Sequence, residues 1–257
     1  MFTLLALCAG LTAIRMAIEH RFDVAIAAIV LAAVLDALDG RVARLLKAAS
    51  RFGAELDSLA DFVNFGVAPA IIVFTWALDG LRSMGWLVVM VFSICAALRL
   101  ARFNVALESD QPAWKGEYFV GVPAPAAALI VMLPLYLDGI GIPDVASLTP
   151  IILGYTLLIA FLMVSFVPTY SGKLFGQRVA RVYVLPVFVL GALFVAVLLT
   201  YPYITLTLGT LAYLAVIPIS FMSYRKHEAK AVRSASAQNG SRKRKSKTAI
   251  DEQRPSV

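Results

Sequence analysis

Four aspartates lie close together in the sequence, where two strongly apolar stretches, residues 24–35 and 62–78, flank them. They are Asp36, Asp39, Asp57 and Asp61. On membrane-insertion scales an acid at the centre of a spanning helix costs roughly 2.5–3.5 kcal/mol, so four of them would cost about 10 kcal/mol. Acids that are this unfavourable in a membrane indicate a function, and a bound cation would compensate their charge. Carboxylate oxygens suit Mg2+, Mn2+ or Ca2+ better than zinc.

The first two aspartates share a helix face with small residues and precede an arginine. Asp36 and Asp39 are three residues apart, which places them on one side of a helix. Gly40 and Ala43 follow on the same side, where they leave room for a flat or bulky ligand group. Arg44 comes next and could bind phosphate oxygens in bidentate fashion. The combination predicts phosphoryl chemistry at a membrane surface.

The other two aspartates repeat the pattern on the following helix. Gly53, Asp57 and Asp61 are spaced four residues apart and therefore also share one face. If the two helices pack antiparallel across the short link near residues 47–52, all four carboxylates converge on one point. The alternative is a set of solvated helix ends. We disfavour it because Asp57 and Asp61 lie inside an apolar segment, 54–78.

The composition is that of a membrane protein. The chain has 257 residues, of which 60% are hydrophobic, and its mean hydropathy is +0.82. Both cysteines, Cys8 and Cys95, lie in apolar stretches, so no disulfide framework is indicated. We predict an all-α integral membrane protein, a polytopic bundle of about eight transmembrane helices. The apolar segments lie near residues 2–19, 23–46, 54–78, 84–104, 121–137, 148–166, 181–200 and 203–222.

Lysine and arginine predict the orientation. If the link after the second helix faces the cytoplasm, 20 of the 23 basic residues fall on that side, and Arg15, Arg21 and Arg82 do not. We therefore expect a multi-pass protein of the inner (cytoplasmic) membrane, with the acidic motif and both termini facing the cytoplasm.

The end of the chain differs from the rest. Residues 1–222 are predicted to form the transmembrane domain, and residues 223–257 a basic, disordered cytoplasmic tail. The tail is expected to be attracted to the anionic headgroups of the lipid bilayer, by about 1 kcal/mol for each basic residue near the surface. No aromatic or fold signal accompanies this charge, so nucleic acid is not an expected partner.

The acidic stretch resembles the signature of the CDP-alcohol phosphotransferase family, D-x-x-D-G-x-x-A-R-x8-G-x3-D-x3-D. Every fixed position is matched, by Asp36, Asp39, Gly40, Ala43, Arg44, Gly53, Asp57 and Asp61. The resemblance covers roughly residues 2–175, and more loosely the last two helices. It implies a six-helix catalytic core followed by two C-terminal helices, and a homodimer. Four further segments resemble the bacterial family members that use serine; they are residues 58–70, 97–104, 121–128 and 162–173.

This resemblance implies a reaction and its residues. The hydroxyl of L-serine attacks CDP-diacylglycerol, phosphatidylserine forms and CMP leaves. Asp36, Asp39, Asp57 and Asp61 would hold a divalent cation, Mg2+ or Mn2+ and expected as a pair of ions, with Ca2+ as a further candidate. Asp61 would also act as the general base, because a serine hydroxyl is a poor nucleophile until a base takes its proton.

The donor substrate is expected to bind along the same motif. By the resemblance, Gly40 and Ala43 lie against the cytidine and Arg44 against the diphosphate. Gly53 would allow close helix packing. Asp36 and Asp39 belong to this CDP-diacylglycerol site as well as to the metal site.

The acceptor needs charges of its own, because serine carries a carboxylate. Arg99 and Arg102 are three residues apart near the cytoplasmic end of the fourth apolar segment, with Asn104 close by. Lys173 lies in a cytoplasmic link. These four are the candidate serine-binding residues, since an arginine can pair with a carboxylate in bidentate geometry. The alternative is that both arginines only extend to the lipid headgroups.

Two other functions remain open at this stage. A family member with a different acceptor, such as glycerol phosphate or inositol phosphate, would share the motif but need a more basic acceptor pocket. A divalent-cation channel or transporter would use the aspartates as a pore site. The neighbouring Arg44 argues against the second, because it would repel a passing cation.

Overall fold

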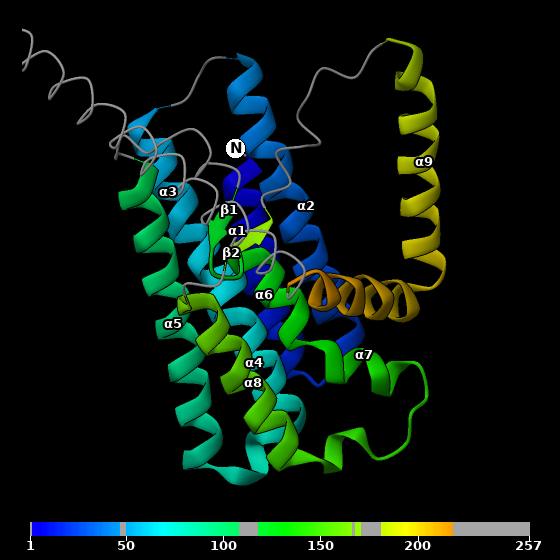
Figure 1. The fold of residues 1–257 in the computed structure, drawn as a ribbon. Coiled ribbons are helices and arrows are strands. Elements are labelled where there is room, and N and C mark those ends of the chain that lie inside the picture. Colours follow the sequence, from blue (N-terminus) through cyan, green and yellow to red (C-terminus); the bar gives the residue numbers. More distant parts are fainter. Residues whose placement is uncertain (1, 47–49, 108–117, 166–167, 171–180, 218–257) are drawn as a thin grey trace, which may run out of the picture.

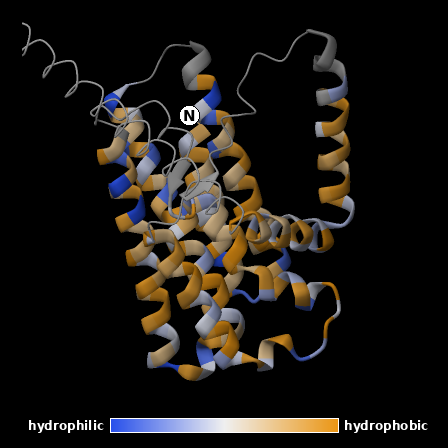
Figure 2. Cartoon of the chain, viewed as in Figure 1, coloured by the Kyte–Doolittle hydropathy of each residue, from blue (hydrophilic) through white to orange (hydrophobic). Residues whose placement is uncertain are grey.

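The computed structural model describes residues 2–46, 50–107, 118–165, 168–170 and 181–217. Within these ranges nearly every residue is helical, and each of the eight predicted apolar segments forms helix. The prediction of an all-α membrane protein is confirmed. Figure 1 shows most of the long helices running roughly side by side, and Figure 2 shows that most residues of these helices are apolar. The predicted boundary at residue 222 and the basic tail 223–257 lie outside the described residues.

The first half of the chain supplies most of the bundle. Its α-helices are α1 (Phe2–Ile18), α2 (Phe22–Leu46), α3 (Arg51–Asp61), α4 (Ala68–Val73) and α5 (Ser83–Leu107). Two π-helical turns, η1 (Phe62–Val67) and η2 (Phe74–Leu78), and the 3-10 turn η3 (Asp79–Leu81) join α3, α4 and α5. The resulting helical stretches Arg51–Leu81 and Ser83–Ala106 are each long and apolar enough to cross a membrane.

The second half is more broken. It contains α6 (Ala124–Val131), α7 (Leu133–Gly139), the 3-10 turn η5 (Val145–Ser147), α8 (Thr149–Val164), α9 (Arg181–Thr200) and a last helix, Pro202–Ile217. The predicted segment 121–137 is therefore two helices, interrupted at Met132. Pro134 explains the interruption, because proline has no N–H to continue a helix and is tolerated in a first turn.

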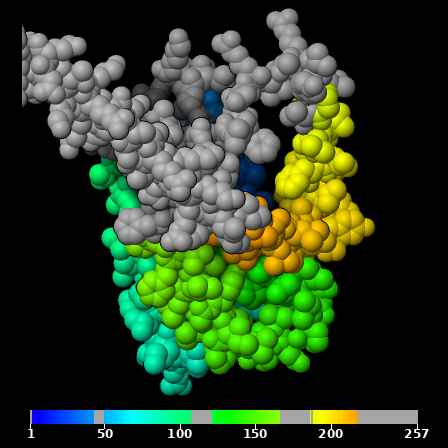
Figure 3. Space-filling view, viewed as in Figure 1, coloured from blue at the N-terminus to red at the C-terminus, as the bar shows by residue number. Residues whose placement is uncertain are grey.

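The last two helices form a bent pair. Phe188–Thr200 and Pro202–Ile217 meet at 119°, and together they are long and apolar enough to form a broken membrane span or a re-entrant loop. α9 stands at the edge of the molecule, and the last helix lies between it and the bundle (Figures 1 and 3). Tyr203 fixes the start of the last helix, because its hydroxyl donates to Asp23 at the start of α2 and its ring occupies the space beside Gly139.

A short pair of strands was not predicted from the sequence. β1 (Tyr118–Val120) pairs antiparallel with β2 (Pro168–Tyr170), so that Phe119 lies opposite Thr169. Each strand is only three residues long. The pair joins the segment before α6 to the segment after α8.

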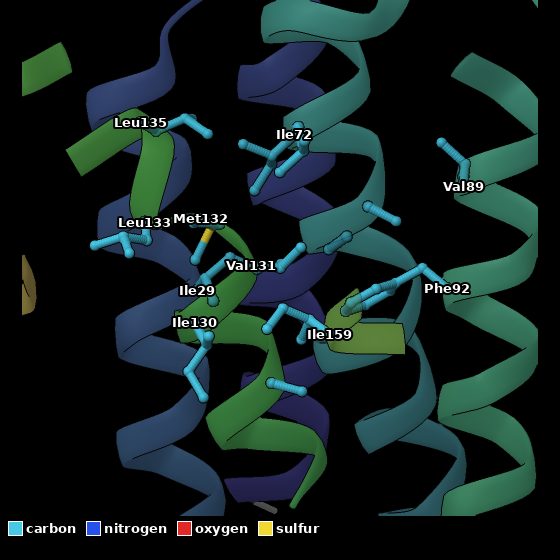
Figure 4. Packing of buried hydrophobic residues seen from close by; sticks show 14 of the residues in the cluster. Ile29, Ile72, Val89, Phe92, Ile130, Val131, Met132, Leu133, Leu135 and Ile159 are labelled. Carbon is cyan, nitrogen blue, oxygen red and sulfur yellow. The ribbon is translucent and has the colours of Figure 1, made fainter. Parts of the chain in front are cut away.

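The hydrophobic core lies where α1, α2, α4, α5, α6 and α8 meet. Figure 4 shows several of its side chains pointing toward one another, among them those of Ile29, Ile72, Phe92, Ile130 and Ile159. All five are at most 2% exposed. This core holds α2 directly, and it holds α3 through η1 and α4, which continue α3 along the chain.

Close helix packing is most evident between α1 and η1. A Cβ atom at Gly10 of α1 would overlap the side chain of Asn64, which is fully buried. Ser93 of α5 donates a 3.2 Å hydrogen bond to the carbonyl of Gly66, in the same π-helical turn. Small residues at such crossings let helix backbones approach closely in a membrane.

We therefore predict that Gly10→Ala lowers the thermal stability of the protein. The added methyl group must displace Asn64 or move α1, and overpacking of this kind costs about 1–3 kcal/mol. Gly154→Ala is the matched control, since Gly154 is an exposed position of α8 with no described atom within 4 Å of an added Cβ. Thermal unfolding of both purified variants in detergent measures the difference. Equal melting temperatures for Gly10→Ala and the wild type would contradict this packing.

Candidate functional site

Three of the four aspartates converge between α2 and α3. Asp36, Asp57 and Asp61 each offer a carboxylate oxygen, and these oxygens all lie within 4.8 Å of one another. Helix geometry explains the convergence. Asp57 and Asp61 are one turn apart on α3, so they lie on the same face of that helix, where they meet Asp36 of α2. All three side chains are half-buried. We call these three residues the aspartate triad.

The fourth aspartate is held by the start of α1. The backbone N–H of Thr3 donates to Oδ2 of Asp39 at 2.9 Å, and the Thr3 hydroxyl donates to the same oxygen. Asp39 follows Asp36 by less than one turn of α2. The fourth carboxylate thus stands beside the triad, and its partner is a residue that the sequence analysis did not single out.

Arg99 of α5 provides positive charge next to the triad. It is only 8% exposed, and it lies within electrostatic reach of Asp61 and Tyr213. Its guanidinium carbon is 5.4 Å from the centre of the Phe103 ring. A buried arginine needs such partners, because burying an unpaired charge is costly. Of the basic side chains that the structure describes, Arg99 is the buried one.

The other two acceptor candidates on α5 connect helices. Nη1 of Arg102 donates to the carbonyl of Val164, at the end of α8, at 2.8 Å. Nδ2 of Asn104 donates to the hydroxyl of Ser58 on α3 at 2.9 Å, directly beside Asp57. Arg102 therefore joins α5 to α8, and Asn104 joins α5 to the helix that carries two of the triad aspartates.

The remaining motif residues lie along the same two helices. Gly40 is exposed on α2, and Ala43 and Arg44 lie near the end of that helix, their side chains outside the part of the structure that is described. Gly53 is in the first turn of α3, where its N–H donates to the Ser50 hydroxyl at 3.0 Å. Among the described residues, Ser50 Oγ is the one atom within 4 Å of a Cβ built on Gly53, so the close approach there is to the helix cap.

Lys173 lies outside the described residues. Ser58 and Tyr213, like Thr3, were not identified from the sequence. Thr3 is a polar residue in the apolar first half of α1, and that position was a signal that the sequence analysis did not use. Ser58 and Tyr213 carry no signal of this kind, because their roles depend on which helices become neighbours.

The chemistry of the triad fits a divalent cation. Three carboxylate oxygens at this spacing are hard ligands of the kind that Mg2+, Mn2+ and Ca2+ prefer. Within the described residues this is the group of acids close enough together to hold a metal ion. Arg99 offsets part of the negative charge, and a cation at the triad would offset more of it.

The fold and the site define a helical membrane protein with a cluster of carboxylates suited to a metal ion. The family model described as CDP-alcohol phosphatidyltransferase matches residues 1–167, and a second one, CDP-alcohol phosphatidyltransferase 2, matches residues 182–218. The chain belongs to the CDP-alcohol phosphatidyltransferase family. The resemblance found in the sequence is confirmed.

Individual relatives are also similar to this chain. CDP-diacylglycerol–serine O-phosphatidyltransferase of Mycobacterium leprae is 55% identical over 131 residues, which are 51% of this chain and 43% of that protein. The protein of the same name from Helicobacter pylori J99 is 39% identical over 165 residues, or 64% of this chain and 68% of the relative. The Saccharomyces cerevisiae protein of that name is 45% identical over 107 residues, 40% of this chain and 38% of the relative. The match thus spans less than half the length of the mycobacterial relative.

We predict that Mn2+ raises the melting temperature of the purified protein. Asp57→Asn should raise the Mn2+ concentration needed for half of this increase by a factor of at least about ten. The amide supplies only a neutral oxygen, so a ligand charge is lost. Glu55→Gln is the matched control, because Glu55 is an exposed acid on the same helix outside the triad. Thermal melting across a Mn2+ series, without substrates, gives the half-saturating concentration of each variant. Equal shifts in Asp57→Asn and the wild type would contradict metal binding at the triad.

Proposed function

We propose that this protein synthesises phosphatidylserine, by transferring the phosphatidyl group of CDP-diacylglycerol to the hydroxyl of L-serine with release of CMP. The observation that carries the proposal is the buried Arg99 beside the aspartate triad, in a chain of this family. The similar relatives bear the name of this activity.

The roles of the acids follow from their chemistry. Asp36, Asp57 and Asp61 would hold a divalent cation, Mg2+ or Mn2+, with Asp39 next to them as a fourth ligand and room for a pair of ions. When bound, the metal neutralises charge on the diphosphate and on the departing CMP. Asp61 accepts the proton of the serine hydroxyl. The serine oxygen then forms a bond to the phosphorus that carries diacylglycerol, and the bond from that phosphorus to the CMP oxygen breaks.

Donor binding is assigned to the small residues and to Arg44. Gly40 and Ala43 would lie against the cytidine, and Arg44 would pair with the diphosphate, as the family motif implies. Gly53 supports this site indirectly, since it lies in the capped first turn of the helix that carries Asp57 and Asp61. The reaction would face the cytoplasm at the inner membrane, given the distribution of lysine and arginine. A homodimer is proposed from the family resemblance.

Arg99 is the favoured residue for the serine carboxylate. It is buried and within electrostatic reach of the proposed base, Asp61, whereas Arg102 uses one guanidinium nitrogen to bind the end of α8. Asn104 bonds Ser58, so it is proposed to hold α3 in place. Lys173 stays a candidate from sequence alone.

Two alternatives are less well supported. A phosphorylated acceptor, such as glycerol phosphate or inositol phosphate, carries more negative charge than serine. Its binding site would need more than one buried basic side chain. A divalent-cation transporter is disfavoured because Arg99 would repel an ion that passes the triad.

Identification of the lipid product tests the proposal. The purified protein, supplied with CDP-diacylglycerol and Mn2+, is given labelled L-serine, glycerol phosphate or inositol phosphate in parallel. We expect labelled phosphatidylserine and CMP from serine alone. A labelled product from a phosphorylated acceptor would establish the first alternative. CMP release that no alcohol increases would contradict transfer to an alcohol.

We predict that the two arginines of α5 behave differently. Arg99→Ala should raise the serine KM by a large factor, because removal of one partner of a buried charge pair costs roughly 2–5 kcal/mol. Arg99→Lys should also be impaired, since lysine lacks the planar fork. Arg102→Ala should mainly lower the melting temperature, since it loses the bond to Val164. Initial rates against serine, at saturating CDP-diacylglycerol, together with melting curves, separate the two. An unchanged serine KM in Arg99→Ala would remove Arg99 from the acceptor site.

A further inference from the structure

Thr3 makes an unusual contact for a residue in the first turn of a membrane helix. Both of its donors, the backbone N–H and the hydroxyl, reach one oxygen, Oδ2 of Asp39, across 36 positions of the sequence. The threonine is 8% exposed. The contact therefore lies within the bundle, and it ends on the one motif aspartate outside the triad.

The start of a helix is well suited to hold a carboxylate. The first N–H groups of an α-helix have no partner within the helix. The helix dipole also favours negative charge at that end. Oδ2 of Asp39 thus accepts the N–H of Thr3 from a neighbouring helix. A threonine adds a second donor that alanine at this position would lack.

The packing of α1 against α2 fixes this contact. The buried face of α1 consists mainly of small residues that continue from Thr3 toward the end of the helix. They include Ala6, Ala9, Gly10, Ala13 and Ala17. Small residues allow two helices to approach closely, so the first turn of α1 is set at the level of Asp39. The position of Oδ2 is then determined by the helix pair as well as by the aspartate itself.

We infer that Thr3 is a positioning residue for Asp39. With Oδ2 held by Thr3, Oδ1 would be the oxygen of Asp39 available to a metal ion bound at the triad. The inference rests on the metal site of the proposed function. It adds a residue of α1, outside the aspartate motif, to the support of that site. Partners that orient a metal ligand commonly change metal affinity by 10- to 100-fold when they are removed.

Mn2+ binding, followed without substrate, tests this role. The full chain is purified in detergent, and the Mn2+ concentration for half-maximal thermal stabilisation is measured. Thr3→Val keeps the shape and the N–H but removes the hydroxyl, and it should raise that concentration by about 10- to 100-fold. Thr3→Ser restores the hydroxyl and should titrate like the wild type. Thr3→Ala, which suits the small-residue face of α1, is a second variant that should shift in the same direction as Thr3→Val.

Thr12→Val is the matched control. The Thr12 hydroxyl donates at 2.7 Å to the carbonyl of Cys8 on its own helix, and Thr12 is exposed. Its loss should leave the Mn2+ titration unchanged. If Thr3→Val and Thr3→Ala lower the melting temperature but keep the wild-type Mn2+ midpoint, Thr3 only packs helices and the inference is wrong. A wild-type protein that Mn2+ does not stabilise would overturn the metal site and this inference together, whereas phosphatidylserine synthesis is measured separately.

Discussion

The mutual repulsion of carboxylates in an apolar bundle is the constraint on which this structure depends. One carboxylate oxygen each of Asp36, Asp57 and Asp61 lies within 4.8 Å of the others, although like charges at that distance repel one another, more strongly away from water. The surrounding helices must hold them there. The core between α1, α2, α4, α5, α6 and α8 holds α2 directly, and it holds α3 through η1 and α4, which continue the same helical stretch. Arg99 then offsets part of the charge beside Asp61, and Thr3 donates to the neighbouring Asp39.

Much of the site could be predicted because its spacing is local. The intervals of three and four residues in the aspartate motif place side chains on one helix face in any helical structure. The link between α2 and α3 is short, so antiparallel packing of these two helices is the simplest arrangement. The apolar segments likewise predicted the helices, and the family resemblance predicted the motif residues as a set.

The contacts missed by the sequence analysis are those made between distant helices. The contact between Thr3 and Asp39 depends on the relative position of α1 and α2 along their axes. The pattern of apolar residues does not specify this position. Asn104 meets Ser58, and Arg102 meets Val164, for the same kind of reason. Arg99 and Arg102 look equivalent in the sequence. They differ in the structure because one turn of α5 separates a position beside Asp61 from one at the end of α8. Pro134 could have predicted the helix break at Met132, but the surrounding residues are all apolar and were assigned to one helix.

The π-helical turn η1 has a consequence for how this helix can vary. It begins at Phe62, directly after Asp61, and a π-turn is in effect an α-helix with one inserted residue. One residue corresponds to about 100° of rotation around a helix axis. The insertion therefore sets the angle between the acidic face of α3 and the buried face of α4, which carries Ile72 and Val73. Deleting a single residue there would turn the acids away from α2 while both faces kept their sequences. Substitutions on either face, by contrast, leave the angle alone, so the chemistry of α3 and the packing of α4 can evolve independently.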